Sequence, residues 1–201
     1  MVVVALPPRL SPPSLGQDSS LRYRSNLYYT MKEGFFVQQS VYDSPLGPVF
    51  LWFKEGRLIY ATFREDYGNE WLAKRFPQSK AEMQPLQKGF QADLDTYFSG
   101  ARMEFAWPLQ LTGTDFQKRV WQEIQAIPHG QVTTYKKIGE SLGTKAFRAI
   151  GQACGANPIS LIIPCHRVLG THSLGGYGGG TNRKRLLLEL ENVTLAPNLW
   201  A

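Results

Sequence analysis

Cysteine and histidine are scarce in this sequence. Of its 201 residues only two are cysteine, Cys154 and Cys165, and only three are histidine. Two cysteines do not make the disulfide framework that holds small secreted domains together. So few thiol and imidazole groups also make no convincing zinc site. We therefore expect two reduced thiols and no bound metal.

Long apolar runs are missing too, and we expect no secretory leader. No apolar run approaches the ~18 residues of a membrane span. The first six residues have no basic start and are too short for a signal-peptide core. We expect an intracellular protein with no membrane partner, located in the cytoplasm or, in a eukaryote, in the nucleus. Residues 1–30 hold four prolines and five serines without a periodic pattern, which predicts a disordered leader.

Charge is unevenly distributed along the chain. The composition, 43% hydrophobic and 19% charged, is that of an ordinary globular protein. Residues 31–107 carry nine basic and ten acidic side chains, whereas residues 108–201 carry ten basic and five acidic ones. The basic excess of the second half favours a polyanionic partner such as nucleic acid.

The first half has the pattern of a small α/β domain, for which we predict the bounds 31–107. Three strand candidates, separated by turn signals, indicate a small antiparallel sheet: 35–42, 49–53 and 57–63. Two helix candidates follow at 69–76 and 86–98. No catalytic set assembles in this half, which we interpret as a scaffold.

The second half, residues 108–196, is predicted to be mainly helical and to contain a helix-turn-helix. Thr114 and Gln117 have the spacing of a capping box. Thr134 is expected to cap a helix over 135–142, and Thr144 a second helix over 145–156. A last helix, 183–191, is expected to be capped by Asn182 and to turn Leu186, Leu187 and Leu190 inward.

The second helix of this motif offers two faces. One comprises Phe147, Ile150 and Cys154, spaced as a buried face, so Cys154 is predicted to be structural and inert. The other comprises Ala146, Ala149 and Ala153, with Arg148 and Gln152 beside it. A small-residue face allows close approach to DNA, and it serves equally for ordinary helix packing.

A Cys-His pair follows this motif. Pro164 and the apolar residues 161–163 precede Cys165, and His166 and Arg167 follow it. A neighbouring base or cation lowers a thiol pKa below about 8.5 and makes the thiolate a nucleophile. The alternative is a small core cysteine beside a surface histidine. The glycine-rich segment 175–180 allows close backbone approach to a ligand but lacks the Gly-Lys-Ser/Thr ending of a phosphate-binding loop.

Three runs favour the functional interpretation: Arg-Ala-Ile-Gly-Gln-Ala-Cys-Gly-Ala-Asn-Pro from Arg148, Ile-Pro-Cys-His-Arg-Val from Ile163, and Gly-Gly-Tyr-Gly-Gly-Gly from Gly175. Together they closely resemble the O6-alkylguanine-DNA alkyltransferases, which are suicide DNA-repair proteins. The likeness covers about residues 35–195. It implies an α/β domain followed by a winged helix-turn-helix domain, with transfer of the alkyl group from O6-alkylguanine to the protein.

The resemblance also implies roles for individual residues. Cys165 would accept the alkyl group, His166 would act through a water as the base on the thiol, and Glu191 would orient that histidine. Asn157 would buttress the turn before the active site. Tyr135 would press on the phosphate of the target nucleotide and donate a hydrogen bond to the purine.

Further implied roles concern DNA and the guanine pocket. Arg148 would fill the gap left by a flipped nucleotide. Contacts with DNA would also come from Tyr135, Ala146, Ala149, Gly151 and Gln152. The pocket would be formed by Ser160, Val168, Gly176, Tyr177 and Gly178. The implied partner is double-stranded DNA that contains O6-alkylguanine, with O4-alkylthymine as a candidate second lesion. The protein would be a monomer that requires no cofactor.

Three other functions remain open at this stage. A non-catalytic relative that grips alkylated bases would lack the acceptor cysteine, usually having tryptophan, whereas Cys165 is present here. A helix-turn-helix transcription factor would need several long polar side chains to contact bases, and this helix offers mainly Arg148 and Gln152. A cysteine hydrolase would need an oxyanion hole, for which the sequence offers no evident element.

Overall fold

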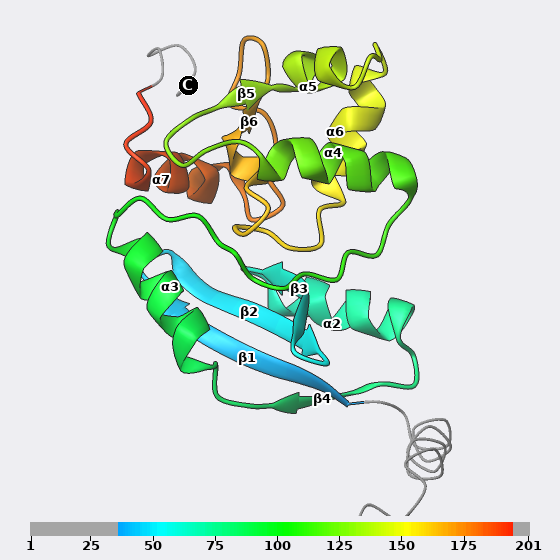
Figure 1. Ribbon diagram of the computed structural model, residues 1–201, viewed down its shortest axis with the longest axis vertical. Helices are drawn as coiled ribbons and strands as arrows, with labels where there is room; N and C mark the ends of the chain where they lie inside the picture. The colour runs from blue at the N-terminus through cyan, green and yellow to red at the C-terminus, as the bar shows by residue number, and fades with distance from the viewer. Residues whose placement is uncertain (1–35, 195–201) are drawn as a thin grey trace, which may run out of the picture. The chain divides into compact units, whose positions relative to one another are not determined.

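The computed structural model of the chain describes residues 36–194. The predicted leader at 1–30 lies outside this range, as do residues 31–35 and 195–196 of the two predicted domains. None of the helices between residues 36 and 194 is long and apolar enough to cross a membrane. As predicted, an α/β part precedes a mainly helical part (Figure 1).

A sheet forms the centre of the α/β part. Its strands, in spatial order, are β3 (Arg57–Thr62), β2 (Gly47–Lys54), β1 (Phe36–Ser44) and β4 (Lys80–Met83). The first three pair antiparallel, as predicted, but β4 pairs parallel to β1, so the sheet is mixed and not purely antiparallel. Sequence analysis missed β4 because its Lys-Ala-Glu-Met run is only four residues long, is fully exposed and consists mostly of residues with low strand propensity.

Helices cover both faces of this sheet. Helix α3 (Lys88–Phe98) packs on one face, where Phe90 stacks on Phe53 with ring centroids 5.2 Å apart. Helix α2 (Glu65–Arg75) packs on the other face, where Trp71 lies against Tyr60 at 4.7 Å. Helix α2 begins four residues before the predicted start, since two acidic residues open its first turn and favour the helix N-terminus.

The helical part begins with α4 (Asp115–Gln125), whose predicted capping box is confirmed: the Thr114 hydroxyl accepts from Gln117 N, and the Gln117 side chain accepts from Thr114 N. Helix α5 (Tyr135–Ser141) is capped by Thr134 as predicted. Helix α6 (Phe147–Gly155) completes the helix-turn-helix. Its predicted cap is wrong, because the helix starts after Ala146 and the Thr144 hydroxyl accepts from the Ala146 N–H in the turn.

The α/β part and the helical part are joined through backbone hydrogen bonds. The N–H of Ala61 on β3 donates to Pro158 O, and the N–H of Ser160 donates to Ala61 O, both at 2.9 Å. Leu58, also on β3, forms a parallel bridge with Leu109. Strand β3 therefore supports the segment that leads from α6 toward Cys165.

A glycine-to-alanine substitution tests the packing of α2 on the sheet. A Cβ atom at Gly68 would lie 2.0 Å from the Trp52 ring, which is fully buried. We therefore expect Gly68→Ala to lower the free energy of unfolding by about 1–3 kcal/mol, measured by urea denaturation.

Gly89→Ala in α3 is the matched control. A Cβ atom there meets nothing within 4 Å, so the substitution should raise the free energy of unfolding by about 0.5–1 kcal/mol. If Gly68→Ala raised the free energy of unfolding as Gly89→Ala does, the close approach of α2 to Trp52 would be contradicted.

Candidate active site

A short strand pair brings Tyr135 and the Cys165 segment together. Strand β5 (Thr133–Thr134) pairs parallel with β6 (Val168–Leu169). Helix α5 begins at Tyr135, directly after β5, and the single 3₁₀ turn η1 (Cys165–Arg167) ends directly before β6. The two segments are therefore fixed side by side, although they lie 30 residues apart in the sequence.

The turn that precedes Cys165 is held by Asn157. The side-chain amide of Asn157 donates to Ile163 O at 2.8 Å, and its oxygen accepts from Ile159 N at 3.0 Å. Within this turn the buried residue Leu161 has φ +77°, a left-handed conformation that costs about 1–2 kcal/mol for a residue with a Cβ atom. The Asn157 hydrogen bonds hold this strained turn in place.

A cavity of about 180 Å³ opens beside Cys165. Its lining combines residues from α5, from α6 and from the glycine-rich loop: Tyr135, Gly151, Cys154, Gly155, Cys165, Gly176, Tyr177 and Gly178. Of the predicted pocket residues, Ser160 and Val168 are not among those that line it. Cys154, predicted to be structural and inert, is buried and lines the same cavity as Cys165.

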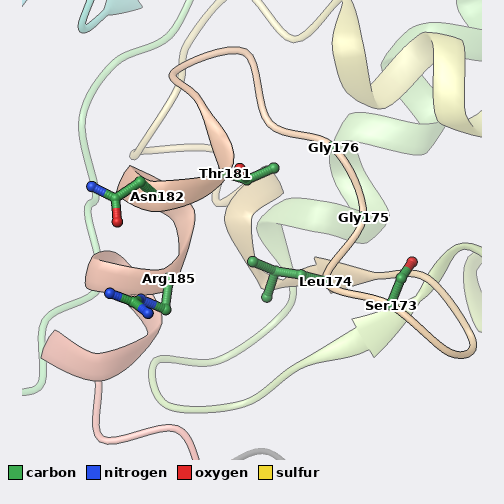
Figure 2. Close-up of a pocket in the computed structure, with 7 residues that line it drawn as sticks. All are labelled: Ser173, Leu174, Gly175, Gly176, Thr181, Asn182 and Arg185. Carbon is green, nitrogen blue, oxygen red and sulfur yellow. The ribbon is translucent and has the colours of Figure 1, made fainter. Parts of the chain in front are cut away.

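The glycine-rich loop separates this cavity from a more open hollow of about 560 Å³. The hollow lies between residues 173–176 of the loop and the first half of α7 (Thr181–Leu190), as Figure 2 shows. Gly176 borders both spaces. Gly175 is required in the loop, because its φ is +74° and a Cβ atom would lie 3.3 Å from the Tyr135 ring. The loop is thus held against Tyr135.

Helix α7 turns two charged residues into the protein. It starts at Thr181 after Gly180, so the predicted Asn182 cap is wrong. Its buried residues are Lys184, Leu187 and Leu188, and Glu191 follows one turn later, also buried. The spacing 184, 187, 188, 191 is one face of a helix. Leu186 and Leu190, which were predicted to face inward, are only half-buried.

The carboxylate of Glu191 accepts hydrogen bonds from four residues. Oε1 accepts from Tyr97 Oη and from His166 Nε2, both at 2.7 Å, and from Arg167 Nη2 at 3.0 Å. Oε2 accepts from Arg167 Nε at 2.8 Å and from Gly130 N at 3.2 Å. Burial alone would raise the pKa of Glu191, but the hydrogen bonds and charges of His166 and Arg167 outweigh it and hold that pKa well below its usual range. Glu191 is therefore ionised.

The ionised carboxylate determines which nitrogen of His166 carries a proton. A carboxylate only accepts hydrogen bonds, so the proton of the neutral imidazole is assigned to Nε2. Burial lowers the pKa of His166, although Glu191 opposes this effect. Nδ1 is left with a free lone pair, and it is buried with no hydrogen-bond partner among residues 36–194. His166 is thus a neutral imidazole whose free lone pair is on Nδ1.

The thiol of Cys165 is tuned by opposing effects. Burial raises its pKa, whereas the Asn157 amide and the charge of Lys184 lower it. The Lys184 ammonium is fully buried and donates to Val168 O at 2.6 Å and to Gly176 O at 3.2 Å. Burial lowers its own pKa to about 8. We predicted Arg167 as the cation near the thiol, but Arg167 is paired with Glu191. The cation that acts on the thiol is Lys184. Burial raises the pKa of Cys154 to about 12, so this second thiol stays protonated.

The exposed side of α6 carries most of the predicted DNA-contacting residues. Ala146, Arg148 and Gln152 are exposed, and Ala149 and Gly151 are half-buried. One prediction for the faces of this helix is wrong. Phe147 is 39% exposed and not part of the buried face; its ring packs against Gly139 of α5. Ala153, on the small-residue face, is buried and its carbonyl accepts a hydrogen bond from Trp121 Nε1, so at this residue the face serves helix packing.

Two residues of this site escaped sequence analysis. Lys184 could have been found, because it falls on the apolar stripe of α7 where a lysine is unexpected. Tyr97 could not, because it lies 94 residues before Glu191 in the α/β half that we interpreted as a scaffold.

Both halves of the chain match known families. Residues 37–111 match the family described as "6-O-methylguanine DNA methyltransferase, ribonuclease-like domain". Residues 115–193 match "6-O-methylguanine DNA methyltransferase, DNA binding domain".

Individual relatives share most of their length with this chain. The methylated-DNA–protein-cysteine methyltransferase of Mycobacterium tuberculosis (strain ATCC 25618 / H37Rv) is 42% identical over 154 residues, which are 74% of this chain and 88% of that protein. The protein of the same name from Methanosarcina acetivorans is 38% identical over 154 residues, which are 76% of this chain and 96% of that protein.

Solved structures of proteins from this family are also similar to this chain. The crystal structure of Mycobacterium tuberculosis OGT in complex with DNA is similar with a TM-score of 0.67 and 40% identity, covering 77% of this chain and 92% of that one. The structure of Mycobacterium tuberculosis O6-methylguanine methyltransferase has a TM-score of 0.66 at the same identity and coverage. The chain belongs to the 6-O-methylguanine DNA methyltransferase family.

Proposed function

We propose that this chain is a methylated-DNA–protein-cysteine methyltransferase, which repairs O6-methylguanine in duplex DNA by moving the alkyl group onto Cys165. The observation that carries this proposal is the position of Cys165. Its thiol lies at a cavity bordered by Tyr135 and Tyr177, and the His166–Glu191 pair follows directly behind it.

The first step is removal of the thiol proton. His166 Nδ1 is the free nitrogen of a neutral imidazole, and it accepts the proton of Cys165 through a water molecule. The resulting imidazolium is stabilised by the ionised Glu191 carboxylate at 2.7 Å from Nε2. Burial raises the pKa of the thiol, and Asn157 and Lys184 oppose this rise and so favour the thiolate that forms.

The second step is displacement at the alkyl carbon. The thiolate forms the new S–C bond while the C–O6 bond breaks, and the electron pair remains on the guanine. The proton taken from the thiol returns to the purine, so guanine is released in its normal form. A thioether is a very poor leaving group, so each molecule reacts once.

Binding to DNA is assigned to α6 and its surroundings. A base inside a duplex is out of reach of Cys165 and has to be extruded, at a cost of a few kcal/mol. Ala146, Ala149 and Gly151 allow α6 to approach the duplex closely, and the exposed Arg148 side chain fills the space that the extruded nucleotide leaves. The basic excess of residues 108–201 supplies phosphate contacts that do not depend on sequence.

Intact-mass measurement tests the acceptor. Incubation with excess duplex that carries one O6-methylguanine should add one methyl group to the protein and then stop, and peptide mapping should locate it on Cys165. Cys154→Ala is the matched control and should still accept one methyl group, because its thiol stays protonated. Continued turnover, or a methyl group on Cys154, would contradict the proposal.

Arg148→Ala separates base extrusion from chemistry. Loss of support for the extruded state should slow repair of duplex substrate by about 10–100-fold, whereas reaction with free O6-benzylguanine base should be nearly unchanged. Both rates come from single-turnover mass or fluorescence assays.

Lys145→Ala removes an exposed cation just before the same helix and serves as the control. It should weaken duplex binding modestly and reduce the salt slope by about one. If Arg148→Ala slowed the reaction with duplex and the reaction with free base equally, Arg148 would act on the pocket and not on extrusion.

A further inference from the structure

Tyr97 connects the α/β part of the chain to the candidate active site. It lies near the end of α3, is fully buried, and donates from its hydroxyl to Glu191 Oε1 at 2.7 Å. The same oxygen accepts from His166 Nε2, also at 2.7 Å. Tyr97 and His166 therefore share one acceptor atom.

We propose that Tyr97 is a positioning residue that sets the basicity of His166 through their shared acceptor, Glu191 Oε1. The proposal rests on the function proposed above, in which His166 is the base for the Cys165 thiol. It gives the α/β part a share in the chemistry, beyond the scaffold role that we expected from the sequence.

The direction of the hydrogen bond is fixed. An ionised carboxylate has no proton to give, so the tyrosine hydroxyl must be the donor. Burial and the neighbouring Glu191 charge raise the pKa of Tyr97 well above its ordinary value, so the hydroxyl keeps its proton. The positive end of the O–H dipole therefore points at Oε1 throughout the working pH range.

This dipole weakens the attraction between Glu191 and a charged His166. A donor that already binds Oε1 reduces the negative potential at Nε2, and the effect is strong because the dielectric constant of a buried site is low. With the hydroxyl present, the imidazolium is less favoured and His166 stays neutral at rest. A neutral His166 is the form that accepts a proton.

Other ionisable groups face this pair and remain in place when the hydroxyl is removed. The charges of Glu191, Arg167 and Lys184 act on the pKa of His166, and the His166 ring contacts that of Tyr177. Glu191, Arg167 and Tyr177 act on the pKa of Tyr97, and the Tyr97 ring contacts that of His129. The ring of Tyr97 is also held by Phe98 and Phe105, with centroids 5.2 and 5.5 Å away. Phenylalanine therefore fits the same space, and Tyr97→Phe isolates the hydroxyl.

The test is NMR of His166 in the full-length protein with ¹³C,¹⁵N-labelled histidine. In Tyr97→Phe the proton on Nε2 should move further downfield, because its hydrogen bond to Oε1 strengthens. The pKa of His166 should rise by about 0.5 unit. The acid limb of the pH–rate profile for transfer from an O6-methylguanine duplex should move to higher pH by a similar amount.

Tyr42→Phe is the matched control. Tyr42 is also buried and donates to a carboxylate, Asp95 Oδ1 at 2.9 Å, on the same helix α3. Its loss should leave the His166 signals and the pH profile unchanged. Replacement of Tyr97 by 3-fluorotyrosine, a stronger donor, should move both His166 observables opposite to Tyr97→Phe, which a purely structural role would not do.

The outcomes separate the two proposals. A shift of the His166 signals without a shift of the pH profile would support the coupling through Glu191 and overturn His166 as the base. Unchanged His166 signals in both Tyr97 variants would overturn the coupling, whatever the transfer rate. The coupling would also be overturned if Tyr97→Phe and 3-fluorotyrosine at position 97 moved the His166 signals in the same direction.

Discussion

The ionised carboxylate of Glu191 is the group on which the site depends. It is 2% exposed and accepts five hydrogen bonds, which come from α3, from the loop after α4 and from the Cys165 turn. A buried carboxylate is stable only when it is paired and fully hydrogen-bonded. Removal of one partner from such a pair costs about 3–5 kcal/mol, so these segments are held in one arrangement. That arrangement leaves His166 Nδ1 as the free nitrogen beside the Cys165 turn.

A second buried charge, Lys184, connects the Cys165 turn to the glycine-rich loop. Its two acceptors are backbone carbonyls, Val168 O after the Cys165 turn and Gly176 O in the glycine-rich loop. One helix thus presents a cation toward the thiol and an anion toward the imidazole, two turns apart on the same face of α7. In the proposed function the cation favours the thiolate and the anion favours the imidazolium. Both charges that develop on proton transfer are therefore met by groups already in place.

The sequence predicts those structural elements that depend on patterns within a few neighbouring residues. The Thr114–Gln117 capping box, the helix-turn-helix and the first three strands each rest on spacings within a few residues, and the structure has them. Strand β4 was missed because it is a four-residue, fully exposed edge strand built mostly from residues with low strand propensity. Phe147 was misplaced because helical spacing cannot show that its ring packs against Gly139 of the preceding helix and stays partly exposed. The contact between Tyr97 and Glu191 joins residues 94 positions apart, and no local pattern indicates such a pairing.

The central claim is that the charge of Glu191 serves chemistry through His166 and does not serve DNA binding. Its most direct test compares the transfer rate with the Kd for an O6-methylguanine duplex in Glu191→Gln, in protein shown to be folded by circular dichroism. We expect a transfer rate reduced on the order of 10²-fold with a Kd within about twofold of the unsubstituted protein. An unchanged rate, or a Kd weakened as much as the rate, would contradict it.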